Sequence, residues 1–124
     1  MILVDASIWI DLFRTGDHKA ELNRLVENSQ LCMHPCLVAE LALGSLPDRR
    51  RTLEYLDRLH QIPVMRVGDV RHMIEARGLF AKGIGLTDAY LIASCLAVPG
   101  TQIWTRDKKL GKAADSLGIR ARFP

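Results

Sequence analysis

The chain has 124 residues, of which 48% are hydrophobic and 25% charged, the proportions of an ordinary globular protein that can bury a core without disulfide or metal staples. A formal net charge of +3 permits a nucleic-acid partner without requiring one. The longest apolar stretch, around residues 91–98, is too short to cross a bilayer, and the N-terminus lacks the basic segment of a signal peptide. We therefore expect a cytoplasmic protein with no membrane association, folded as one domain over residues 1–124.

Strand and helix signals alternate from the N-terminus, a pattern typical of an α/β domain with a parallel sheet. The apolar run Ile2-Leu3-Val4 predicts a strand buried on both faces, and residues 7–14 predict a short helix. Asp17 is expected to cap a second helix. The residues of that helix expected to face the core are Leu22, Leu25 and Val26.

The middle of the chain repeats this alternation. Residues 31–33 predict the second strand, and Pro35 and Gly44 bracket a helix that carries Glu40. Pro47 opens a helix with leucines on one face and arginines on the other. Residues 62–67 predict a third strand, which Pro63 restricts to an edge of the sheet.

The last third of the chain contains the most apolar helix. Asp69 is expected to cap a helix that closes near Gly83, and the next helix starts at residue 86 or 87 and is apolar nearly all round. A helix of that kind lies buried at the centre of a domain. Residues 102–105 predict another strand, and residues 108–117 predict a terminal helix.

Three cysteines, Cys32, Cys36 and Cys95, are odd in number and lie in apolar surroundings, which favours buried thiols in a reducing compartment. Cys32, His34 and Cys36 alternate along one predicted strand face. The chain lacks a second ligand pair at a zinc-finger spacing, so a zinc site is not favoured.

Four acidic residues lie far apart in the chain, each at a strand end or on a helix that passes the strand ends. They are Asp5, Glu40, Asp88 and Asp107. The carboxyl ends of parallel strands share one crevice, so separate segments can deliver these side chains to one point. Two carboxylates about 4 Å apart repel by roughly 4 kcal/mol at an effective dielectric near 20, so a cluster must share protons or hold a cation. Hard cations such as Mg²⁺ choose oxygen ligands.

Neighbouring residues support this hypothesis. Asp88 enters the first turn of the buried helix, where the macrodipole favours a negative charge. Ser7 and Thr105 lie two residues from Asp5 and Asp107, and their hydroxyls could orient those carboxylates. Taken singly, Asp88 could be a helix cap and Asp107 a loop acid. Glu40 is harder to explain in that way, because its apolar neighbours leave little solvated face.

The chain resembles a known family, the PIN-domain ribonucleases, and specifically the VapC toxins of bacterial toxin–antitoxin pairs. The resemblance rests on the order and spacing of ILVDASIWID, VAELALG, GLTDAYLIAS and WTRD, and it covers essentially the full length. It implies a three-layer α/β/α fold with a central, mainly parallel sheet, metal-dependent endonucleolytic cleavage of RNA, a homodimer, and inhibition by a cognate VapB-type antitoxin. Asp5, Glu40 and Asp88 match the core acids of the family, whereas Asp107 matches a variable position that is often asparagine.

The mechanism implied is metal-assisted hydrolysis of a phosphodiester bond. Mg²⁺ or Mn²⁺ held by the four acids would activate a water molecule and neutralise phosphate charge. The family suggests transfer RNA or ribosomal RNA as substrate. Four basic residues beside the last acid could hold RNA phosphates, or could simply form a solvated helix start: Arg106, Lys108, Lys109 and Lys112. The alternative function is a catalytically weak PIN-like module that only binds RNA.

Overall fold

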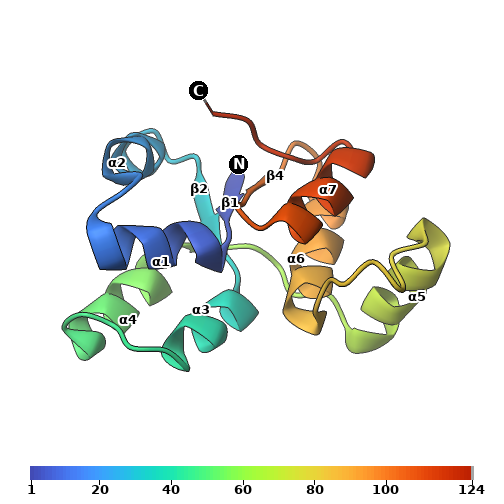
Figure 1. The fold of residues 1–124 in the computed structure, drawn as a ribbon, viewed down its shortest axis with the longest axis horizontal. Helices are drawn as coiled ribbons and strands as arrows, with labels where there is room; N and C mark the ends of the chain where they lie inside the picture. Colours follow the sequence, from blue (N-terminus) through green and yellow to red (C-terminus); the bar gives the residue numbers. More distant parts are fainter. Residues whose placement is uncertain (124) are drawn as a thin grey trace.

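A four-stranded parallel sheet in the order β3-β2-β1-β4 forms the centre of the computed structural model, which describes residues 1–123 (Figure 1). The strands are β1 (Ile2–Val4), β2 (Leu31–Met33), β3 (His60–Gln61) and β4 (Gln102–Trp104). The helices are α1 (Ala6–Thr15), α2 (Lys19–Glu27), α3 (Pro35–Ala42), α4 (Arg49–Arg58), α5 (Val67–Arg77), α6 (Leu86–Ala97) and α7 (Lys108–Ser116). The predicted α/β architecture with a central parallel sheet is confirmed.

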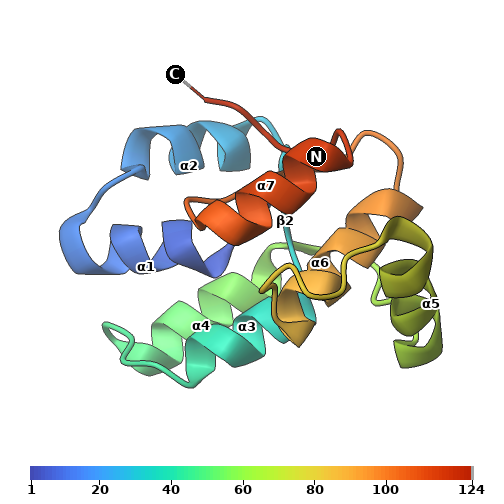
Figure 2. The same ribbon diagram turned by 45° about the vertical axis from the view of Figure 1, so that its right-hand side comes forward.

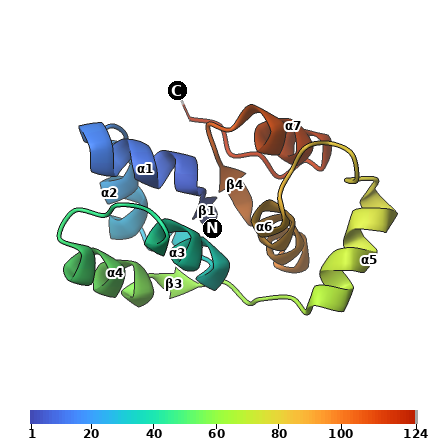
Figure 3. The ribbon, with the colours of Figure 1, turned by 60° about the horizontal axis from the view of Figure 1, so that its bottom comes forward.

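The helices flank the sheet in two groups. Figures 1 and 3 show α1 to α4 on one side of the strands and α5 to α7 on the other. This division follows from the strand order, because the chain moves outward from β1 through β2 to β3 and then returns past them to β4. Right-handed crossovers in opposite directions along a sheet place their helices on opposite faces.

The register of β1 and β4 places the carboxyl ends of these two strands next to each other. Val4 lies opposite Trp104, and the backbone N–H of Asp5 donates to the Trp104 carbonyl oxygen at 2.9 Å. Leu3 and Val4 are fully buried, as expected for a central strand. The two connections that leave β1 and β4, toward α1 and α7, therefore start side by side.

Helix α6 is the buried helix that the sequence predicts. Leu91 and Ile92 are fully buried, and the hydroxyl of Ser94 donates to the Pro63 carbonyl oxygen at 2.6 Å. The helix packs against α3, α5 and β4. Figure 2 shows α3 beside α6, so the helix that carries Glu40 neighbours the one that carries Asp88.

The third strand differs from its prediction. It comprises His60 and Gln61 rather than residues 62–67. The Ile62 N–H still donates to the Met33 carbonyl oxygen at 2.8 Å, but Pro63 has no N–H to continue the ladder, and the chain leaves the sheet there.

Two predicted helix starts are also wrong. Helix α2 is preceded by His18 in a left-handed conformation (φ 68°) rather than by Asp17, and α5 begins at Val67, upstream of Asp69. Val26, expected to face the core, is 37% exposed. Within residues 1–123 no helix is long and apolar enough to cross a membrane.

Candidate active site at the carboxyl ends of the strands

The four acids gather around the carboxyl ends of β1 and its two neighbours. Asp5 directly follows β1, Asp107 lies just beyond β4, Glu40 is on the helix after β2, and Asp88 is in the first turn of α6. Burial, together with the charges of the other three acids, raises the pKa of Asp88 to about 6, against a hydrogen bond from Gly85 that lowers it. Asp5, Glu40 and Asp107 therefore each lie near enough to Asp88 to influence its charge.

The arrangement is open rather than closed. Among residues 1–123, no three His, Cys, Asp or Glu side chains already form a group that could enclose a metal ion. Asp5 is 6% exposed, whereas Glu40 and Asp107 are exposed. The expectation that apolar neighbours would shield Glu40 is wrong, because Leu37 and Leu41 are buried while Glu40 lies on the solvated side of α3.

Asp5 is the most rigidly held of these acids. It caps the N-terminus of α1, and its Oδ2 atom accepts hydrogen bonds from the Ser7 hydroxyl (2.9 Å), the Ser7 N–H (3.4 Å) and the Thr105 hydroxyl (2.8 Å). No residue in the described chain donates a hydrogen bond to its Oδ1 atom. One oxygen of Asp5 therefore fixes the side chain, and the other retains its capacity to bind a cation.

The hydroxyls of Ser7 and Thr105 join the two strand ends. Each hydroxyl has one proton, which it donates to Asp5, and each accepts a backbone N–H at 3.0 Å, from Arg106 and Asp107 respectively. The sequence suggested that Thr105 would orient the carboxylate of Asp107. The structure shows instead that both hydroxyls orient Asp5.

Asp88 and Asp107 each use one oxygen at a helix N-terminus. The Oδ2 atom of Asp88 accepts the Gly85 N–H at 3.3 Å, and the Oδ1 atom of Asp107 accepts the Leu110 N–H at 2.9 Å as the cap of α7. Such hydrogen bonds hold a carboxylate in one orientation. Asp107, expected as a loop acid, is thus the N-cap of α7, whereas Asp88, expected as a possible cap, lies three residues inside α6 and reaches back to the N-cap residue Gly85. The second oxygen of each carboxylate remains available.

The donor set fits a hard divalent cation. It consists of carboxylate oxygens only, and hydrogen bonds to one oxygen anchor three of the four acids: Asp5, Asp88 and Asp107. A bound cation would also offset the desolvation and like charge that raise the pKa of Asp88. The residues that could hold such an ion are Asp5, Glu40, Asp88 and Asp107.

The basic residues near Asp107 divide into two groups. Arg106 forms a two-pronged ion pair with Asp11 (Nε to Oδ2 2.7 Å, Nη2 to Oδ1 2.8 Å), and His18 also contacts that carboxylate at 3.0 Å. The pairing occupies the guanidinium and makes Arg106 a brace between α1 and the β4–α7 connection.

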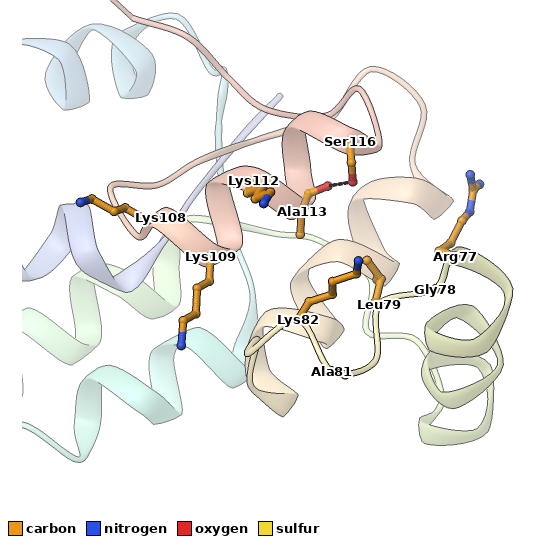
Figure 4. Close-up of a pocket in the computed structure, with 10 residues that line it drawn as sticks. All are labelled: Arg77, Gly78, Leu79, Ala81, Lys82, Lys108, Lys109, Lys112, Ala113 and Ser116. Carbon is orange, nitrogen blue, oxygen red and sulfur yellow. Dashed lines mark hydrogen bonds between the residues drawn. The ribbon is translucent and has the colours of Figure 1, made fainter.

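Lys108, Lys109 and Lys112 instead line a pocket of about 610 Å³ together with Arg77 and Lys82 (Figure 4). Arg77 and Lys82 were not among the basic residues expected near the site from the sequence. Lys82 lies in the glycine-rich segment KGIG just before Asp88, and its nearness to that acid in the chain was the signal available.

Three comparisons with known proteins agree with this architecture. A PIN domain family model matches residues 2–116. The chain is 40% identical over 119 residues to Ribonuclease VapC32 of Mycobacterium tuberculosis, in strains CDC 1551 / Oshkosh and ATCC 25618 / H37Rv, covering 96% of this chain and 94% of that protein. The crystal structure of PAE2754 from Pyrobaculum aerophilum superposes with a TM-score of 0.63 at 18% identity, over 91% of this chain and 84% of that one, which supports the fold alone.

Proposed function

The chain belongs to the PIN-domain family, and from that premise we propose that it is a metal-dependent endoribonuclease of the VapC toxin type. One observation carries the proposal: in Asp5, Oδ2 is held by hydrogen bonds while Oδ1 is free to bind a cation. Asp5, Glu40 and Asp107 also lie close enough to Asp88 to raise its pKa. The 40% identity to a relative named as a ribonuclease supports RNA as the substrate, with transfer or ribosomal RNA as the expected class.

Asp5 and Asp88 are the main ligands in this proposal, with Glu40 and Asp107 completing the set. A bound Mg²⁺ or Mn²⁺ would supply a water molecule of lowered pKa and neutralise charge on the phosphate. The hydroxyls of Ser7 and Thr105 hold Asp5 in one orientation, so that its free oxygen is preorganised before substrate arrives. The Gly85 N–H at the start of α6 opposes, but does not cancel, the desolvation that raises the pKa of Asp88.

Regulation follows from the same acids. A basic side chain of a VapB-type antitoxin inserted among the acids would pair with them and compete with the metal. We further propose that the 1–124 domain acts in the cytoplasm as a homodimer and forms a tight complex with the antitoxin. A partner helix would contact the exposed apolar side chains of Leu43, just beyond the end of α3, and Tyr55 on α4.

The direct test uses purified protein and total RNA with Mg²⁺ or Mn²⁺, with EDTA as the metal-free reference. Cleavage at discrete sites is expected, and Asp5→Asn should abolish it while the circular dichroism spectrum stays unchanged. Asp57→Asn, which removes an exposed acid on α4, is the matched control and should cleave normally. RNA binding without cleavage by the intact protein would favour the alternative, a PIN-like module that only binds RNA. Equal cleavage by Asp5→Asn would refute the proposed site.

A further inference from the structure

The pocket beside α7 carries a concentration of positive charge that the acidic site does not explain. Its five cationic side chains are Arg77, Lys82, Lys108, Lys109 and Lys112, and none of its lining residues is acidic. None of the five forms an ion pair within residues 1–123, in contrast to Arg106. Unpaired cations around one hollow repel one another, and a bound polyanion relieves that repulsion. We call this hollow the lysine pocket.

The floor of the lysine pocket is apolar. Leu79, at the start of the loop between α5 and α6, is 5% exposed, and Ala113 of α7 is 7% exposed. An apolar floor under a charged rim suits a ligand with one flat hydrophobic part and one anionic part, which describes a nucleotide. The volume of about 610 Å³ lies within the range of pockets that enclose small organic ligands. A hollow of this volume is of the size that a single unstacked nucleotide needs.

Both walls of the lysine pocket continue directly into the acidic site. On one wall, Lys108 and Lys109 immediately follow Asp107. On the other, the loop over residues 78–85 runs into the N-terminus of α6 and so to Asp88. Figure 4 shows lysines contributed from both walls, from α7 and from this loop. A chain bound at the acids therefore has a short, positively charged path into the pocket.

Gly83 brings the two walls together. A Cβ atom at this position would lie 2.8 Å from Cδ and 3.0 Å from Nζ of Lys109, so the absence of a side chain allows Lys109 to lie across the loop. The backbone at Gly83 is left-handed (φ 78°), a conformation that glycine adopts without strain. The loop is thus built to accept the lysine close to its backbone.

We propose that the lysine pocket receives an unpaired nucleotide next to the scissile bond, with its phosphate on the lysines and its base on Leu79 and Ala113. This inference rests on the proposed ribonuclease function and assigns a specific place in the fold, the lysine pocket, to the nucleotide beside the cleavage point. RNA recognition by proteins generally targets such unstacked bases in loops and bulges.

The test measures RNA binding in an Asp5→Asn background, so that no cleavage interferes. Two RNAs share one sequence, but in the second a complementary strand closes the flank. Lys82→Gln combined with Lys112→Gln should weaken binding of the open RNA about tenfold and reduce its salt slope by roughly 0.7 for each phosphate that the protein no longer neutralises. Binding of the closed RNA should change much less. Arg50→Gln combined with Arg51→Gln removes the same charge from the exposed face of α4 and should affect both RNAs slightly and equally.

Equal weakening of both RNAs by the pocket variant, or no weakening, would overturn the inference. Its failure is distinguishable from failure of the proposed function, because cleavage is scored separately with Asp5 intact. If the wild type cleaves RNA and the pocket variant also cleaves and binds normally, the proposed ribonuclease function stands and the proposed role of the lysine pocket is refuted. If the wild type cleaves no RNA, the proposed ribonuclease function is refuted, whatever RNA the pocket variant binds.

Discussion

Replacing Asp88 by asparagine should stabilise the metal-free protein. Burial and the three neighbouring acids raise the pKa of Asp88 from 3.8 to about 6, so the charged carboxylate present at neutral pH destabilises the folded state. That difference corresponds to about 3 kcal/mol of stability withheld from the folded state above pH 6. Asp88 is only partly buried, so solvent screens part of this energy, and an asparagine would accept a weaker hydrogen bond from Gly85 than the carboxylate does. The expected gain is therefore about 1–2 kcal/mol, or a rise in Tm of about 5 °C.

The stability difference between Asp88→Asn and the wild type should depend on pH in a defined direction. The folded state binds the Asp88 proton near pH 6 and the unfolded state near 3.8, so the wild type gains stability relative to Asp88→Asn as the pH falls through this window. The advantage of the variant should be full at pH 7.5 and absent by about pH 3.8. His34 acts in the opposite direction, because burial lowers its pKa and acid then favours unfolding below pH 6.5. The subtraction of wild type from variant cancels the contribution of His34.

The measurement is thermal or urea unfolding in EDTA at pH 7.5 and pH 4, with Asp57→Asn as the control. Added Mg²⁺ or Mn²⁺ should then raise the Tm of the wild type and leave that of Asp88→Asn nearly unchanged, since a ligand that binds only the folded state stabilises it. A variant less stable than the wild type at pH 7.5, or a difference that does not change with pH, would refute the electrostatic reasoning.

Three further predictions concern the surroundings of the acids. Asp107→Asn should reduce cleavage only in part and raise the Mg²⁺ concentration required, because asparagine retains the helix cap; a loss as complete as that of Asp5→Asn would contradict this ranking. Thr105→Val should lower kcat by about 10- to 100-fold at unchanged fold, and Thr105→Ser should restore it, since serine keeps the hydroxyl that donates to Asp5 and accepts the Asp107 N–H. Gly83→Ala should lower stability by about 1–2 kcal/mol through its left-handed backbone and weaken RNA binding by displacing Lys109, so a neutral effect on both would count against the close approach.

The sequence predicted the strands and helices whose formation depends on local patterns. The continuous apolar residues of β1 and β2, and the apolar surface around α6, are enough to predict that these elements are buried. The predictions were wrong where a local backbone constraint overrode the pattern of apolar and polar residues. Residues 62–67 have β-forming composition, yet Pro63 lacks the N–H that the ladder needs, and α2 begins after a left-handed His18 that no side-chain preference indicates.

The acids of the candidate site were visible in the sequence because each follows a recognisable element. Their environments were not visible, because they depend on contacts between distant segments. Arg106 looked like an RNA contact until its partner Asp11, 95 residues away in the chain, was placed beside it. Lys82 had no distinguishing partner in the sequence, because only the folded chain places the α5–α6 loop opposite α7.

The two oxygens of Asp5 have a consequence for how inactive forms of this protein can arise by mutation. Oδ2 caps α1 and ties the β1 and β4 connections together, so most replacements at Asp5 disturb folding as well as chemistry. Glu40 is exposed on α3 and its side chain anchors no other residue within residues 1–123, so its replacement should leave the fold intact. A genetic selection for loss of toxicity that also demands full-length, soluble protein should therefore recover many different substitutions at Glu40. At Asp5 it should recover little besides asparagine, the one side chain that preserves both shape and hydrogen-bond acceptance.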